Sequence, residues 1–267
     1  MTATSNRWAD LRPRLLSAIV MVAVGAVEIW LGGPTFAALV VVLTAVMVWE
    51  LAGMTAPWRL ASPVMLGAAS GVALAVALFV PHALAWGVLV LPVLAMAATP
   101  RRDRGLATVY VALILVAGHG LVTLRDGLGG LGILWLVAVV IASDVLGYFA
   151  GRIIGGPKFW ERISPKKTWS GTIAGWLGAA LVAAGFVLAG QGGWLLVPVS
   201  ALVAFAGQMG DILESWIKRR AGVKDASAII PGHGGLLDRF DALIVAVVAV
   251  EVLSLLGPLP LGAALGT

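Results

Sequence analysis

The chain has 267 residues, of which 60% are hydrophobic and only 12% charged, and its mean hydropathy is +1.01. This composition lies outside the range of soluble globular domains and indicates an integral membrane protein with a formal charge of +5. The absence of cysteine excludes disulfides, thiolate metal ligands and thiol nucleophiles.

Nine membrane-spanning helices are predicted along the chain, because each span needs about 20 mostly apolar residues. They are expected at about 14–32, 34–52, 62–80, 83–99, 106–122, 130–149, 171–189, 194–213 and 239–257. The predicted fold class is therefore all-α and polytopic. We divide the chain into a cytoplasmic N-terminal segment at 1–13, transmembrane helices at 14–142, and a transmembrane region at 143–267 with two cytoplasmic loops. The first apolar run lacks a convincing cleavage site, so we expect a retained helix and no cleaved signal peptide.

Basic residues alternate between successive loops. With the N-terminus in the cytoplasm, 17 of the 18 lysines and arginines fall in cytoplasmic segments, and only Arg125 falls outside. Positive residues collect on the cytoplasmic side, so this partition supports nine spans and an outside C-terminus. The loop with Arg101 and Arg102 is assigned to topology alone. Topology and attraction to anionic headgroups account for the net charge, and no nucleic-acid partner is expected.

The first long loop reads SDVLGYFAGRIIGGPKFWERISPKKTWSGT, from Ser143 to Thr172. Asp144 and Tyr148 are four residues apart and share a helix face near the cytoplasmic end of the sixth predicted span. An acid in a membrane segment is a functional candidate by default, although a hydrated interfacial carboxylate is the alternative. Cations and glycine-rich backbone suited to phosphate follow it, at Arg152, Lys158, Lys166 and Lys167.

The second loop begins within the eighth predicted span, on a polar helical stripe formed by Asp211, Glu214, Ser215 and Lys218. On the ninth predicted helix Asp238 and Asp241 are three residues apart. Asp211 and Asp238 lie at facing ends of consecutive antiparallel helices, where two carboxylates could share Mg²⁺. Alternatively, each acid is neutralised by a neighbouring cation and braces the two helices. His233, set among glycines, is more typical of loop structure than of a metal ligand or base.

From Ser215 to Asp241 the sequence SWIKRRAGVKDASAIIPGHGGLLDRFD resembles the signature of phosphatidate cytidylyltransferases. A serine, a Lys-Arg pair, a Lys-Asp pair, a Pro-x-His-Gly-Gly turn and an Asp-Arg-x-Asp end recur at this spacing. GDILES, SDVLGYFAGR and ISPKKT also resemble family segments, so the resemblance covers about 143–241. There are two departures: Ser170 stands where an acid is frequent, and Ala242 where a serine is common.

The resemblance implies an enzyme of phospholipid biosynthesis that converts CTP and phosphatidic acid into CDP-diacylglycerol and pyrophosphate. It implies a homodimer in the cell inner (plasma) membrane, in contact with membrane lipids, with its site facing the cytoplasm. Mg²⁺ on Asp211 and Asp238 is the expected cofactor, and a second, monovalent cation is left open. The expected catalytic residues are Asp211, Asp238, Lys218, Lys224, Asp225 and Asp241. The expected substrate-binding residues are Ser215, Arg219, His233, Gly234, Gly235, Arg239, Lys166, Lys167, Arg152, Asp144 and Tyr148.

Elementary chemistry agrees with this assignment. The second pKa of a phosphate monoester is about 6, so phosphatidic acid is mostly dianionic near neutral pH and needs charge neutralisation more than a strong base. A CDP-alcohol phosphotransferase is disfavoured because its tight Asp-Gly-x-x-Ala-Arg run is not found. A CTP-dependent polyprenol kinase and an ion-coupled transporter remain alternatives; buried acids such as Asp144, Glu214 and Glu28 would suit the transporter. Four residues have no assigned chemistry in the proposed reaction and are interpreted as packing or interfacial: Glu28, Glu50, His119 and Glu251.

Overall fold

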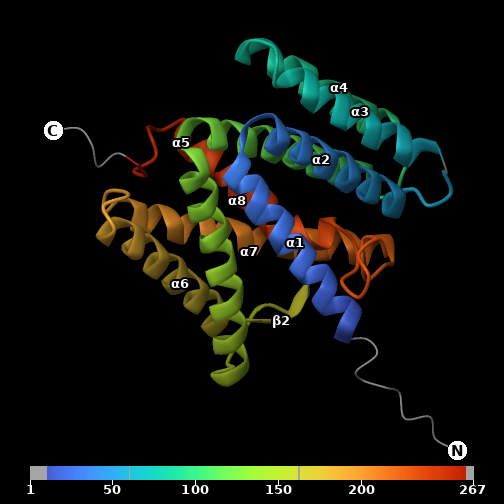
Figure 1. The fold of residues 1–267 in the computed structure, drawn as a ribbon. Coiled ribbons are helices and arrows are strands. Elements are labelled where there is room, and N and C mark those ends of the chain that lie inside the picture. Colours follow the sequence, from blue (N-terminus) through green and yellow to red (C-terminus); the bar gives the residue numbers. More distant parts are fainter. Residues whose placement is uncertain (1–10, 60, 162, 263–267) are drawn as a thin grey trace, which may run out of the picture.

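The computed structural model describes residues 11–59, 61–161 and 163–262, and α-helices dominate this part of the chain (Figure 1). In chain order they are α1 Leu11–Leu31, α2 Gly33–Thr55, α3 Ala61–Ala77, α4 His82–Ala98, α5 Arg104–Ile153, α6 Trp169–Leu188, α7 Leu196–Ala221 and α8 Leu237–Ser254. The expected all-α class is confirmed. Most of the predicted N-terminal segment, including Arg7, lies outside the described residues.

Within the described residues, five helices are long and apolar enough to cross a membrane: α1 from Arg14, α2, α5, α6 and α7. The helices α3 and α4 are apolar but only 17 residues long. The 18-residue α8 carries four charged side chains, at Asp238, Arg239, Asp241 and Glu251. The expectation of a polytopic chain is confirmed at this level, whereas nine spans are not.

The fifth and sixth predicted spans belong to one 50-residue element, α5, which is kinked at Gly129. Gly129 has φ 67° and ψ −163°, a backbone region that is essentially restricted to glycine. The helix changes direction there, and its two arms diverge (Figure 1). The prediction of a loop between these two spans is therefore wrong. Arg125, which was expected in that loop, lies inside the first arm of the helix, just before the kink. Its guanidinium packs so closely on Gly32 that a Cβ there would lie 2.5 Å from Arg125 Cζ.

Three of the segments predicted to face the cytoplasm, those after α2, before α5 and after α7, meet at the opposite end of this arm, about 37 Å along the helix. Arg102 donates its backbone N–H to Thr55 O (2.8 Å) and its Nη1 to Ala221 O (3.0 Å). Arg220 Nη2 lies 2.5 Å from Asp103 Oδ1. These contacts join the C-terminal ends of α2 and α7 to the start of α5. Arg102 was assigned to membrane topology alone, and this assignment is corrected: the residue also holds three helix ends together.

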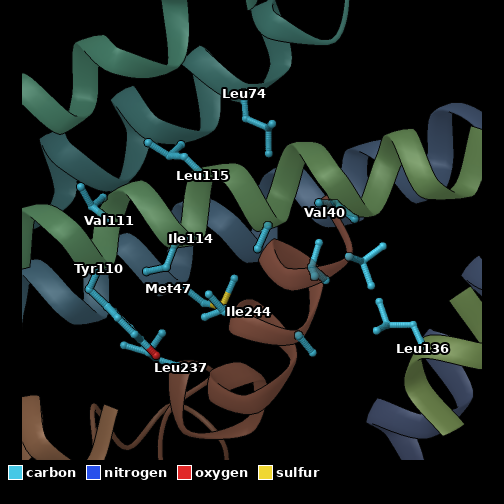
Figure 2. Packing of buried hydrophobic residues seen from close by; sticks show 14 of the residues in the cluster. Val40, Met47, Leu74, Tyr110, Val111, Ile114, Leu115, Leu136, Leu237 and Ile244 are labelled. Atoms are coloured by element: carbon cyan, nitrogen blue, oxygen red, sulfur yellow. The ribbon is translucent and has the colours of Figure 1, made fainter. Parts of the chain in front are cut away.

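A hydrophobic core joins α2, α3, the first arm of α5 and α8 (Figure 2). Leu51, Leu74, Ile114 and Leu237 are each fully buried in it. Tyr110 also lies in this core, and its ring extends toward Leu237 at the start of α8 (Figure 2). The core therefore fixes the position of the N-terminus of α8. Several of the predicted site residues lie in the first two turns of this helix.

Glycines allow α6 to approach the second arm of α5 closely. A Cβ at Gly171 would lie 2.6 Å from Gly147 O, and one at Gly175 would lie 2.7 Å from Ser143 Oγ. Small residues at such crossings let helix backbones pack tightly in membranes. A two-stranded antiparallel hairpin, β1 Lys158–Trp160 and β2 Ser164–Thr168, precedes α6. It was not expected from the sequence, and it carries Lys166 and Lys167.

Candidate active site

A pocket of about 620 Å³ opens between the second arm of α5, β2, α6 and α7. Its volume is in the range of small-molecule sites. The two sequence regions singled out above both contribute side chains to it. The site residues expected from the sequence that line it are Asp144, Tyr148, Arg152, Lys166, Lys167 and Asp211.

The hairpin brings its lysines to α7 because β2 runs directly into α6. Thr168 caps α6 by accepting a hydrogen bond from Gly171 N (3.2 Å). Next to it, Lys167 Nζ lies 2.6 Å from Asp211 Oδ2 and donates to Gln208 O (3.1 Å). The hairpin is thus tied to the helix that carries the first predicted metal ligand.

Ser170 stands where the family resemblance leads us to expect an acid, and its contacts give a physical reason for a serine at this position. Its hydroxyl donates to Gly155 O at 2.5 Å and contacts Thr168 Oγ1 at 3.0 Å. An ionised acid at this position has no proton to donate to a carbonyl. The serine therefore closes the loop between α5 and α6 by a hydrogen bond that a carboxylate could not make.

Two exposed side chains at the pocket, Tyr148 and Arg152, are hydrogen-bonded to each other across one turn of α5. Arg152 Nη1 donates to Tyr148 Oη (2.7 Å), as the four-residue spacing permits. The guanidinium group retains further N–H donors, which suit bidentate contact with phosphate. Lys166 is also exposed at the pocket. Both cations are accessible to an anionic ligand.

A second polar cluster centres on Lys218, at the end of α7. Its Nζ lies 2.5 Å from both Glu214 Oε2 and Asp238 Oδ1. Asp238 Oδ2 in turn accepts hydrogen bonds from Ala226 N (2.9 Å) and Gly235 N (2.7 Å). Asp238 therefore joins α7, the loop after it and the first turn of α8.

Glu50 on α2 is a residue that the sequence did not place in the site. It is buried, and Oε1 accepts hydrogen bonds from Ser227 Oγ (2.5 Å) and Leu236 N (2.9 Å). Its other oxygen, Oε2, accepts from Leu237 N (2.6 Å). A carboxylate is favoured at the positive N-terminal end of a helix. The only signal for Glu50 was an acid in an apolar run, and no local pattern identified partners so far away in sequence.

Carboxylates outnumber ammonium groups around these two clusters. Asp241 interacts electrostatically with Asp211 and Asp144, and Glu214 interacts with Asp241 and Asp238. Lys167 and Lys218 are the ammonium groups paired with them. The α7 and α8 backbones approach closely here, since a Cβ at Gly210 would lie 2.5 Å from Asp241 O. Carboxylates that interact with one another in this way could share a bound cation.

Glu214 Oε1 and the hydroxyl of Tyr110 are buried in the same region without a hydrogen-bond partner among the described residues, and Glu214 Oε2 has only its ion-pair contact with Lys218. Tyr110 lies within the electrostatic reach of Asp211, Glu214, Asp238 and Asp241. In the described chain, no group of three or more histidine and acidic side chains is arranged to hold a metal.

The other predicted residues mostly organise the loop between α7 and α8. Ser215 Oγ donates to Asp211 Oδ1 at 3.4 Å, and Arg219 Nη1 to Val223 O at 3.5 Å. His233 Nδ1 lies 2.8 Å from Ser17 Oγ of α1, and His233 O accepts from Arg239 Nη2 at 2.8 Å. These contacts agree with the interpretation of His233 as loop structure.

Gly234 and Gly235 are required by their surroundings. A Cβ at Gly234 would lie 2.9 Å from Asp238 Oδ2, and one at Gly235 would lie 2.6 Å from Glu50 Oε1. Lys224 and Asp225 are exposed on the same loop and do not line the pocket. The structure thus gathers most predicted residues into two adjacent clusters and leaves these last two at the surface.

Comparison with known proteins agrees with the motifs. Residues 12–256 match the sequence model of the "Cytidylyltransferase family". The chain is 34% identical over 247 residues to a phosphatidate cytidylyltransferase of Brucella abortus biovar 1 (strain 9-941), covering 89% of this chain and 91% of the relative. A protein of the same name from Helicobacter pylori (strain J99) is 41% identical over 128 residues, 47% of each chain. One from Staphylococcus haemolyticus (strain JCSC1435) is 40% identical over 124 residues, covering 45% of this chain and 48% of the relative.

Proposed function

The chain belongs to the cytidylyltransferase family, and on this basis we propose that it transfers a cytidylyl group from CTP to phosphatidic acid. The products are CDP-diacylglycerol and pyrophosphate. The observation that carries the proposal is the pocket beside α7, where three cations and two carboxylates meet at the ends of apolar helices. A triphosphate, a lipid phosphate and a divalent cation need this combination of charges.

Phosphate recognition is assigned to cations at the pocket. Arg152 and Lys166 are exposed there and can contact phosphate oxygens directly. Lys218 is held between Glu214 and Asp238, so its ammonium group keeps a fixed position at the helix end. Fixed charges stabilise a charged transition state without reorganising during the reaction. Because the attacking phosphate is already ionised, no residue is assigned as a strong general base.

Mg²⁺ fits the donor set around Asp211. This ion favours one or two carboxylates, retained waters and substrate phosphate oxygens. Asp211 lines the pocket and is partly exposed. Asp238 has three of its approximately four acceptor positions filled, by Lys218 and two backbone N–H groups. Asp211 would therefore be the principal ligand. Asp238, which belongs to the Lys218 cluster and does not line the pocket, is kept as the proposed second ligand through its one free acceptor position.

A Mg²⁺ ion bound there would neutralise triphosphate charge and stabilise the leaving pyrophosphate. The chain itself contributes by fixing the positions of its charged side chains before the substrates bind. Lys167 and Lys218 balance part of the acidic cluster, and Glu50 and Asp238 fix the loop that precedes α8. Tight α5–α6 packing at Gly171 keeps the pocket walls at a constant separation.

The membrane arrangement is also proposed. We assign a span to each of α1, α2, α3, α4, α6, α7 and α8, and one to each arm of α5, with the pocket facing the cytoplasm of the cell inner membrane. The 17-to-1 partition of basic residues and the meeting of the predicted cytoplasmic loops at one end support this assignment. A homodimer is proposed from the family resemblance.

The direct test is pyrophosphate release by the purified full-length chain in detergent. Release is expected only when CTP, phosphatidic acid and Mg²⁺ are all present, whereas a transporter would not consume CTP. Lys166→Gln should raise the KM for a phosphate-bearing substrate by roughly tenfold or more, because a charge-assisted hydrogen bond is lost. Arg104→Gln removes the same charge from an exposed position that does not line the pocket and should leave KM unchanged.

A further inference from the structure

A second groove, of about 590 Å³, lies between the first turns of α3 and the last turns of α4. The polar side chains in its lining belong to Arg59, Ser62 and Thr99, and the rest of the lining is apolar. The main packing partners of α3 and α4 are each other, α2 and α5. Figure 1 shows α6 on the other side of the molecule. The groove is therefore separate from the candidate active site.

Arg59 lines this groove, and Arg101, which bonds to the groove residue Thr99, interacts with Arg59 electrostatically. Arg101 is 9% exposed and donates to neutral oxygens only: Thr55 Oγ1 (3.1 Å), Ala52 O (3.5 Å) and Thr99 Oγ1. Its Nε has no hydrogen-bond partner among the described residues. Thr99 itself lines the groove, as does the exposed Arg59. In the described part of the chain, neither arginine forms an ion pair.

This arrangement is electrostatically unfavourable unless an anion is present. Burial, and after it the charge of Arg59, lowers the pKa of Arg101, which lies between the helices α4 and α5. A buried charge is costly unless it is paired. The N-terminal end of α3, at Ala61, adds a partial positive charge to the same groove. A negatively charged group at Arg59 would offset all three contributions.

The apolar lining indicates what carries this negative charge. Met65, Leu66 and Ala69 extend the groove along α3, away from the start of the helix. In the proposed membrane arrangement this direction leads toward the bilayer interior. Basic pockets between membrane helices at the cytoplasmic interface bind anionic lipid headgroups. We propose that the groove binds an anionic glycerophospholipid of the surrounding bilayer, with its phosphate at Arg59 and an acyl chain along α3. Because the groove is separate from the catalytic pocket, the inference does not depend on the catalytic assignment; it rests on the proposed membrane arrangement.

The absence of cysteine makes a site-specific probe straightforward. Met65 lines the groove and is 70% exposed, so Met65→Cys can carry a bimane fluorophore. The labelled full-length chain is placed in phosphatidylcholine nanodiscs that contain increasing fractions of brominated phosphatidylglycerol or brominated phosphatidylcholine. We expect half-maximal quenching at an approximately fivefold lower fraction of the anionic lipid, the preference typical of one basic residue at a membrane surface.

Variants in the labelled background assign the preference to the groove. Arg59→Gln should abolish it, Arg59→Lys should retain most of it, and Arg104→Gln, an equal charge change outside the groove lining, should not alter it. Equal quenching by the two brominated lipids would overturn the proposal, as would a preference that survives Arg59→Gln. Preferential quenching by brominated phosphatidate but not by brominated phosphatidylglycerol would also overturn it, in favour of a second site for the substrate.

Discussion

Glu50→Gln tests whether a buried carboxylate on α2 holds the loop that leads into α8. The carboxylate accepts hydrogen bonds from Ser227 Oγ, Leu236 N and Leu237 N at 2.5, 2.9 and 2.6 Å. Glutamine has nearly the same shape but carries no charge, and it has only one acceptor oxygen. Its NH₂ group would face a donor that the carboxylate now satisfies.

The cost can be estimated from these contacts. One buried donor left without an acceptor costs about 1–3 kcal/mol. Loss of the negative charge at a helix N-terminus adds about 0.3–2 kcal/mol. A total of about 3 kcal/mol corresponds to a roughly hundredfold change in the equilibrium for local opening. The loop should therefore open far more often, while the rest of the bundle keeps its packing.

Hydrogen exchange of the amides of Leu236 and Leu237, followed by mass spectrometry, measures this opening directly. Their exchange should accelerate roughly a hundredfold in Glu50→Gln. Glu28→Gln is the matched control, because Glu28 Oε2 is buried without a hydrogen-bond partner among the described residues and its neutralisation removes no contact. Unchanged exchange in Glu50→Gln, or an equal acceleration in Glu28→Gln, would refute the assigned role of Glu50.

Three further predictions concern topology, the loop histidine and a surface ion pair. A reporter fused after Gly190 should lie outside the cell and one near Ala221 inside; the reverse at both sites would contradict the proposed orientation. His233→Gln, assayed for turnover, should stay active with no steeper pH dependence, and total loss in a folded variant that still binds CTP would give His233 a catalytic role. The hydrogen bond from Arg220 lowers the pKa of Asp103, so the stability due to this pair is present at neutral pH and is lost as pH falls through that lowered pKa. Asp103→Asn should slightly lower the melting temperature at neutral pH and not in acid, and a difference that persists in acid would count against the pair.

Local spacing was sufficient to predict which side chains would lie near one another in part of the candidate site. Asp144 and Tyr148 are neighbours on one helical turn, and both line the pocket. The lysines at 166 and 167 are adjacent, so any structure that brings one to α7 brings the other close to it. Such relations hold within a few residues, where helix and strand geometry determines which side chains lie near one another.

The contacts that complete the site are non-local and had no sequence signal. Glu50 and Leu237 are 187 residues apart, and only the packing of α2 against α8 brings them together. The kink at Gly129 was also missed as a structural feature. One predicted span ended at about 122 and the next began at about 130, with Arg125 placed between them, yet a polar residue near a helix end does not terminate the helix. The helix continues until a glycine adopts a conformation that other residues avoid.

The most direct test of the proposed site is turnover of CTP with phosphatidic acid across a Mg²⁺ titration, for Asp211→Asn, Asp238→Asn and the double variant. If the two carboxylates serve one ion, each single variant should lose 10²–10³ or more in rate, roughly the loss of 3–4 kcal/mol of transition-state stabilisation. The double variant should be scarcely slower than either single one, because residues that act as a unit are not additive. Full activity of Asp211→Asn at ordinary Mg²⁺ would contradict the assignment and leave these acids as braces between α7, α8 and their lysines.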